Sequence, residues 1–182
     1  MPLAPALSHP DTFVVRPLDR NSESDRASWA RMRLILFDDL DPEFNEADMA
    51  AFEERHEQEV LLAFADDAGL EARGFSETVG AGASEPTASP QARGFAEVAL
   101  RNLVDGCLTS PVGYLEAIYV DPAARGHGLG KQLLDAAKDW SREQGCTEFA
   151  TDSDLKDVDA QQFHLANGFS ETYRIVQFRM DL

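Results

Sequence analysis

The chain has 182 residues, of which 43% are hydrophobic and 27% charged, a composition typical of one globular domain and not of a disordered or fibrous protein. Sixteen basic residues face 33 acidic ones, and the net charge of -17 disfavours binding to nucleic acid or anionic lipid; it favours either a cationic substrate or simply a soluble surface. No apolar run suits a membrane span and the first residues do not resemble a secretion signal, so we expect a cytoplasmic protein.

The first part of the chain predicts a tail, a strand, two helices and a second strand. Residues 1–11 contain three prolines and predict a flexible tail, and residues 12–16 predict a strand. Ser22 starts a capping-box pattern ahead of apolar residues at helical spacing, which predicts a helix. Asn45 is expected to cap a second helix, and residues 60–64 have the pattern of another strand.

A Gly-, Ala-, Ser- and Pro-rich segment at residues 66–93 predicts a long inserted loop, either a solvated insertion or a lid over a site. Alternation in residues 94–101 predicts a strand. Residues 113–120 form an apolar run interrupted by Glu116, which predicts a central strand with one carboxylate inside it.

The last third of the chain continues with alternating helices and strands. Leucines at helical spacing from Leu129 onward predict an amphipathic helix that ends at Gly145. We expect a strand, a short helix and a final strand at residues 147–151, 160–166 and 172–180. The predicted fold is therefore α/β (α+β), a single domain over residues 12–182 with a mixed central β-sheet flanked by helices.

Three glycines, Gly126, Gly128 and Gly130, lie between the expected central strand and the amphipathic helix. Glycine lets backbone N–H groups close around an anion beside the positive end of a helix, so the loop predicts a phosphate site. A dinucleotide fingerprint would need glycine where Lys131 stands, and a nucleoside-triphosphate loop would need Ser or Thr where Gln132 stands. Both of those alternatives are excluded by the spacing.

The loop Arg125-Gly-His-Gly-Leu-Gly130, preceded by Leu115-Glu-Ala-Ile-Tyr-Val-Asp-Pro122, resembles the pyrophosphate loop and preceding strand of the GNAT acetyltransferase superfamily. The resemblance implies the GNAT fold and acetyl-CoA as cosubstrate. It assigns the pantetheine arm to backbone groups near Ile118 and Val120. The pyrophosphate is assigned to the loop and the helix start, namely Arg125, Gly126, His127, Gly128, Gly130 and Lys131.

Within that superfamily the chain looks most similar to the aminoglycoside 6'-N-acetyltransferases. The similarity rests on segments 110–116, 145–152 and 164–172, with a weaker match at 29–33. In that group, carboxylates that match Glu116 and Asp152 lie at the acceptor site. The resemblance therefore implies a polycationic acceptor, the 6'-amine of an aminoglycoside antibiotic, and a role in resistance.

The residues themselves support this assignment of the acceptor site. Glu116 interrupts an apolar strand, where an ionised carboxylate is costly unless it faces a cleft, a cation or water. Asp152 follows a strand end, where open α/β sheets place their ligands. Glu97 is a third candidate for contact with substrate. The alternatives are a structural ion pair or cap for Glu116 and Asp152, and an ordinary exposed strand carboxylate for Glu97.

The resemblance implies direct attack of the substrate amine on the thioester, without a covalent enzyme intermediate. Our hypothesis is that Glu116 accepts the proton of the amine, directly or through water, while Asp152 binds a neighbouring ammonium group. Many superfamily members carry a tyrosine, the acid that protonates the departing thiolate, at the position of His164. His164 either takes this catalytic role or simply packs against its neighbours.

Several observations leave alternatives open. Leu103 and Tyr173 stand where related drug-acetylating enzymes can carry an aromatic and an acidic residue, so another amine, such as a polyamine, an amino acid or a protein N-terminus, remains an alternative acceptor. A non-catalytic CoA-binding module is a second alternative. The two cysteines form no Cys/His cluster, and no metal site is expected. The last strand, residues 172–180, pairs either within the monomer or with a partner subunit, and we expect a homodimer.

Overall fold

The computed structural model describes residues 13–65 and 91–181. The expected tail and nearly all of the expected insertion lie outside these ranges. Within these ranges ten elements follow one another: β1 (Phe13–Pro17), α1 (Glu23–Leu36), α2 (Pro42–Glu53), β2 (Gln58–Ala65), β3 (Ala92–Arg101), β4 (Val112–Val120), the 3-10 turn η1 (Pro122–Ala124), α4 (Leu129–Glu143), β5 (Phe149–Thr151) and α5 (Val158–Ala166). Strand β3 thus takes in the last two residues of the expected insertion.

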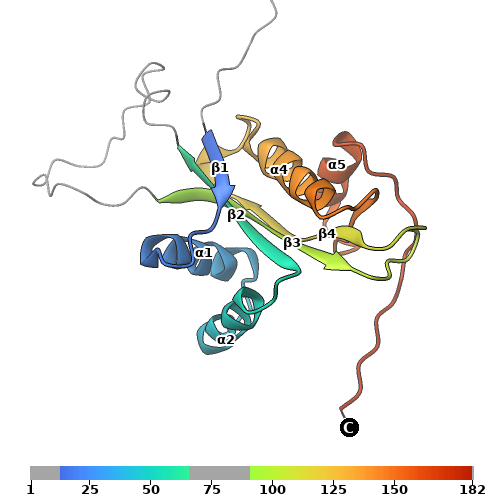
Figure 1. The fold of residues 1–182 in the computed structure, drawn as a ribbon, viewed down its shortest axis with the longest axis horizontal. Helices are drawn as coiled ribbons and strands as arrows, with labels where there is room; N and C mark the ends of the chain where they lie inside the picture. Colours follow the sequence, from blue (N-terminus) through green and yellow to red (C-terminus); the bar gives the residue numbers. More distant parts are fainter. Residues whose placement is uncertain (1–12, 66–90, 182) are drawn as a thin grey trace, which may run out of the picture.

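The strands form one mixed sheet in the order β1-β2-β3-β4-β5. Strands β1 to β4 are antiparallel to their neighbours, and β5 joins β4 in parallel. Helices α1 and α2 lie on one side of the sheet and α4 and α5 on the other (Figure 1). The predicted fold, a mixed sheet flanked by helices, is confirmed. No helix in the described ranges is long and apolar enough to cross a membrane.

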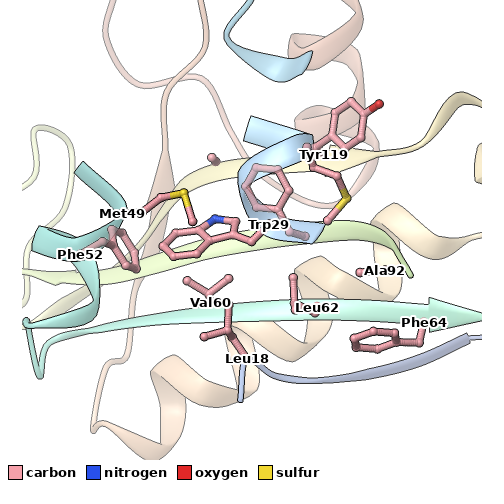
Figure 2. Close-up of a cluster of buried hydrophobic side chains, with 12 residues drawn as sticks. Leu18, Trp29, Met49, Phe52, Val60, Leu62, Phe64, Ala92 and Tyr119 are labelled. Atoms are coloured by element: carbon pink, nitrogen blue, oxygen red, sulfur yellow. The ribbon is translucent and has the colours of Figure 1, made fainter. Parts of the chain in front are cut away.

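One face of the sheet packs against α1 and α2. Trp29 of α1 and Met49 of α2 are completely buried there, next to strand residues such as Val60 and Leu62 (Figure 2). Met32 of α1 is completely buried in the same cluster. Helix α1 begins as predicted, because the Ser22 side chain accepts a hydrogen bond from the Asp25 backbone N–H and so caps the helix. This packing holds α1 and α2 in place against β2, β3 and β4.

The opposite face packs mainly against α4. Leu129, Leu133, Leu134 and Ala137 are almost fully buried there with residues of β2, β3 and β4. These are the apolar positions that predicted an amphipathic helix. Gly145 follows the helix with a φ of 86°, a left-handed conformation that favours glycine and ends the helix.

Strand β4 contains a bulge at Glu116. Glu97 of β3 pairs with Ala117 and Val98 pairs with Leu115, so Glu116 is an extra residue without a partner across the ladder. Two residues apart in a regular strand, Leu115 and Ala117 would share a face. Instead Leu115 packs in the α4 cluster and Ala117 in the α1 cluster. The bulge therefore switches the faces of β4, and Glu116 lies at the switch.

Strands β4 and β5 pair over a short stretch only, Gly113 to Leu115 against Phe149 to Thr151. Among the residues that the structure describes, the same edge of β4 has no strand partner from Glu116 to Val120. Backbone groups along this edge are therefore placed to bind another extended chain.

The second helix begins earlier than predicted. Asp41, not Asn45, is its N-cap: the Asp41 carboxylate accepts hydrogen bonds from the backbone N–H groups of Glu43 and Phe44, and Pro42 occupies the first turn. Asn45 lies inside the helix and is 1% exposed. Its Oδ1 accepts a hydrogen bond of 2.8 Å from Arg33 Nε. The cap prediction was wrong because Asn45 serves tertiary packing.

The final strand is also absent from the structure. Residues 172–180 pair with no strand within the described ranges, and the segment is exposed. It leads away from the body of the protein (Figure 1). An extended segment needs a neighbouring strand to satisfy its backbone groups, and here the sheet ends at the three-residue strand β5.

Candidate active site

A cavity of about 910 Å³ opens on the α1 and α2 side of the sheet. Glu116 lines it from the bulge of β4, and Glu97 and Arg101 line it from β3. Arg33 and Asp48 complete the wall from α1 and α2. Overall, five carboxylate side chains and three arginines line the cavity, which is a suitable setting for a cationic ligand.

Glu116 forms a two-pronged ion pair with Arg101. Arg101 Nε donates to Glu116 Oε1 at 3.0 Å, and Arg101 Nη2 donates to Glu116 Oε2 at 2.6 Å. The guanidinium carbon lies 3.5 Å from the centre of the Tyr114 ring. Such a bidentate pair stacked on an aromatic ring holds both carboxylate oxygens of Glu116 in a defined orientation.

Asp152 joins this group through Tyr114. Asp152, which directly follows β5, lies close enough to the Tyr114 hydroxyl to act on it electrostatically. Burial, together with the negative charge of Asp152, raises the pKa of Tyr114 to about 12, so the phenol remains a hydrogen-bond donor at neutral pH. The two predicted acceptor carboxylates, Glu116 and Asp152, thus both act electrostatically on one tyrosine.

Glu97 lies deeper and is only 4% exposed. Its Oε1 accepts hydrogen bonds from Trp29 Nε1 at 2.8 Å and from Arg33 Nη1 at 2.5 Å. Burial raises the pKa of the Glu97 carboxyl, whereas the charge of Arg33 and the two hydrogen bonds lower it. The alternative prediction, an ordinary exposed strand carboxylate, is therefore wrong for Glu97. Its carboxylate is buried and already has two protein partners. Its predicted contact with substrate stays a prediction.

His164 lies near the end of α5, within electrostatic reach of Asp152. Its ring packs edge to face against Phe163 and Phe169, with ring centres 5.5 and 5.3 Å away. The Nδ1 atom is buried and has no hydrogen-bond partner in the described residues. Burial lowers the pKa of His164, against the opposing charges of Asp157 and Asp152, so the ring is neutral at neutral pH.

This burial predicts a pH-dependent contribution of His164 to stability. The folded state disfavours the protonated ring, so the unfolded chain binds more protons, and stability falls as the pH drops below the ordinary pKa of about 6.5. H164F keeps an aromatic ring in the cluster but cannot be protonated. We expect its melting temperature to fall less than that of the unmodified protein when the pH is lowered from neutral to about 5.5. Calorimetric scans of both proteins measure this, and equal losses would contradict it.

The glycine loop leads from β4 into α4. Gly126 and Gly128 have φ angles of 79° and 81°, in the left-handed region that favours glycine. A Cβ atom built on either residue would meet nothing within 4 Å, so the space beside the loop is open to a ligand. Gly128 is the N-cap of α4, whose first N–H groups and positive dipole end suit an anion. The residues present therefore fit a bound pyrophosphate.

Gly130 has a different role from the other two glycines. A Cβ at this position would lie 3.2 Å from Phe163 and 3.8 Å from Val120. Gly130 therefore permits close packing of α4 against α5 and β4. Arg125 donates from Nε to the Val120 carbonyl oxygen at 3.1 Å, which ties the loop to the strand end. Lys131 pairs with Asp135 on the exposed side of α4.

Ile118 and Val120 lie on the unpaired edge of β4, between the bulge and the glycine loop. Their side chains are partly buried against the α4 cluster. At about 3.3 Å per residue, the strand from Glu116 to Val120 spans about 13 Å. An extended ligand held by its phosphates at the loop can therefore reach Glu116 along this edge.

No role could be predicted from the sequence for Arg101, Arg33 or Tyr114. An arginine at the end of a strand and a tyrosine inside an apolar run are common, and neither indicates a site. A detectable signal was the charge pattern on β3, because Glu97 and Arg101 are four residues apart and so lie on the same face of the strand.

An acetyltransferase family matches this chain and its site, which combines the glycine loop at the start of α4, the bulged and partly unpaired strand β4 and the carboxylate cavity. The model of the acetyltransferase (GNAT) family covers residues 29–169, and the chain belongs to this family.

Within this family, the chain is similar to several aminoglycoside acetyltransferases. An aminoglycoside N(6')-acetyltransferase type 1 of Stenotrophomonas maltophilia is 41% identical over 160 residues, covering 87% of this chain and 89% of the relative. The enzyme of the same name from Klebsiella aerogenes is 33% identical and covers 93% and 97%. The structure of AAC(6')-Iy in complex with the bisubstrate analogue CoA-S-monomethyl-acetylneamine matches with a TM-score of 0.75, 27% identity and coverage of 93% and 99%.

Proposed function

We propose that the protein transfers the acetyl group of acetyl-CoA to the 6'-amine of an aminoglycoside, and so confers resistance. The observation that carries the proposal is the position of Glu116, at a bulge where the carboxylate cavity meets the unpaired edge of β4. The activity for which the relatives are named supports the same reaction and acceptor class.

Acetyl-CoA supplies the thioester whose acyl carbon the amine attacks. In this proposal the N–H groups of Gly126, Gly128 and the start of α4 bind its pyrophosphate, with Arg125, His127, Gly130 and Lys131 completing the loop. Backbone groups of Ile118 and Val120 align its pantetheine arm by strand-like hydrogen bonds. The carboxylates that line the cavity then bind the acceptor near the bulge of β4.

Glu116 acts as the general base of the proposed reaction. It accepts the proton of the attacking amine, directly or through one water, while Asp152 binds another ammonium group of the acceptor and so orients it. Glu97 backs the cavity wall beside Glu116. Because a polycation gains from several carboxylates at once, the acidic cavity favours an aminoglycoside over a monoamine.

His164 is the proposed donor to the departing thiolate. Its lowered pKa means that it donates from a neutral ring at neutral pH, which makes it a weak acid. A thiolate needs less help to leave than an alkoxide or an amide anion does. We therefore expect His164 to contribute less to turnover than Glu116.

Release of free CoA thiol tests the proposed function. Purified protein is mixed with acetyl-CoA and, in turn, with kanamycin, tobramycin, spermidine and a short peptide. Rapid release with the aminoglycosides alone supports the proposal. Release with spermidine or the peptide alone would assign the enzyme another amine. No release despite measured acetyl-CoA binding would contradict the proposed acceptor class.

A homodimer and a cytoplasmic location, where acetyl-CoA is available, belong to the same proposal. The exposed C-terminal segment carries Ile175, Val176, Phe178 and Met180, which are 59%, 77%, 93% and 79% exposed, and β5 is a sheet edge. A second copy can cover both features.

The dimer proposal has a direct test. We expect the unmodified protein to sediment as a dimer at micromolar concentration, and the double variant V176K/F178K to sediment as a folded monomer, because two charges at the apolar interface are costly. A monomeric parent protein, or a variant that remains dimeric, would contradict this interface.

A further inference from the structure

Arg101 occupies the position that an acceptor ammonium group would take in the proposed reaction. Its two nitrogens satisfy both oxygens of Glu116, at 3.0 and 2.6 Å, and its plane lies over the Tyr114 ring. Asp152 also acts on Arg101 electrostatically. The guanidinium is thus surrounded by the carboxylates and the aromatic face that would recognise a cationic substrate.

We propose that Arg101 is an internal competitor for the acceptor site, a cation that binds Glu116 in the free enzyme and must be displaced by the substrate amine. This inference rests on the proposed function of Glu116. It adds a residue that sets the apparent affinity for every cationic acceptor.

The exposure of the pair permits this displacement. The Arg101 side chain is 43% exposed and that of Glu116 is 23% exposed, so the guanidinium can move into solvent without unpacking the core. Arg33 shows the contrast within the same cavity. Its side chain is 5% exposed and is held by Glu97, Asp48 and Asn45, so it cannot leave without cost.

Displacement also frees the other recognition groups. When Arg101 moves away, Glu116 regains the two acceptor sites that face the guanidinium, one on each carboxylate oxygen, and can offer them to the amine. The Tyr114 ring becomes available to the incoming cation.

The expected effect follows from competition between two cations for one carboxylate. The apparent affinity of the acceptor is reduced by the fraction of enzyme in which Arg101 is bound to Glu116. For a partly exposed bidentate pair, we expect removal of Arg101 to lower the acceptor KM by about three- to tenfold. Kanamycin and neamine should show the same factor, since both must displace the same group.

The test uses R101Q, which removes the charge but keeps a polar side chain of similar reach. We expect a lower KM for kanamycin and neamine, with kcat and the KM for acetyl-CoA within about twofold of the parent values. R101K, which retains the charge but loses the bidentate fork, should fall between R101Q and the parent. The matched control is R142Q, which removes an exposed arginine paired with Asp139 on α4 and should change none of these values.

Two results would overturn the inference. An unchanged or higher acceptor KM in a folded R101Q protein would show that Arg101 does not compete with substrate. A large loss of kcat at constant KM would show that Arg101 instead holds Glu116 in place for catalysis. The dissociation constant of kanamycin, measured by calorimetry on both proteins, gives the same decision independently of turnover. Absence of turnover in the parent protein would count against the proposed function, whereas the calorimetric comparison still decides the role of Arg101.

Discussion

E116Q is expected to lower kcat for an aminoglycoside by about 100-fold or more, the usual contribution of a general base. The substitution preserves the size of the side chain and leaves one carbonyl oxygen to accept from Arg101. It removes the carboxylate that we propose takes the proton from the attacking amine. Acetyl-CoA binding should stay unchanged, because the loop proposed to hold its phosphates lies at the other end of β4.

Steady-state kinetics with both substrates and calorimetric binding of acetyl-CoA measure these effects. E143Q is the matched control, since Glu143 is exposed at the end of α4 and the same chemical change there should leave kcat unaltered. If E116Q kept the parent kcat, another group or water would accept the proton. If it lost acetyl-CoA affinity as well, the bulge itself would have been disturbed.

Much of the fold could be predicted because local patterns decide it. The helix that begins at Leu129 has one apolar face, and the structure buries that face. The central strand could be read from an apolar run with one carboxylate. In both cases the residue pattern directly reflects which side of the element meets the core.

The errors occur where tertiary contacts outweigh local preference. Asn45 is a good capping residue, but its amide is taken up by Arg33 in the core. The alternating apolar residues near the C-terminus have a strand pattern, but a strand also needs a partner, and sequence cannot show where that partner lies. The bulge at Glu116 is equally invisible, because it depends on the register of β3 against β4.

The site could be predicted only in part for the same reason. The glycine loop is local, and the structure gives it the open geometry that an anion needs. Glu116 was noticed because a carboxylate inside an apolar strand is unusual. The ion pair of Glu116 with Arg101 and the electrostatic interaction of Asp152 with Tyr114 join residues far apart in the chain. Such pairs depend on the folded sheet.

The second large effect is expected at Arg33. R33M should lower the free energy of unfolding by about 3 to 5 kcal/mol, because it leaves the buried carboxylate of Glu97 without its positive partner. Arg33 is 4% exposed and also donates to Asn45 and Asp48, so it joins α1, α2 and β3. Denaturant unfolding of the two proteins measures the difference.

R26M provides a control on the same helix. Arg26 also has two acidic partners, Glu46 at 2.6 Å and Glu53 at 3.3 Å, but its side chain is 32% exposed. Solvent screens this pair, so its loss should cost less than about 1 kcal/mol. Equal losses in R26M and R33M would show that the burial of the ion pair is not the cause.

The double variant R33M/E97Q separates the charge from the packing. Glutamine keeps an acceptor for the Trp29 N–H but carries no charge, so no ionised group remains buried at this position. If the cost of R33M is mainly the stranded charge of Glu97, the double variant should be more stable than R33M alone, even though it differs from the parent at two positions. If the double variant is less stable than R33M, the hydrogen bonds of Arg33 to Asn45 and Asp48 account for the loss, and the α1 and α2 wall of the cavity depends on those contacts.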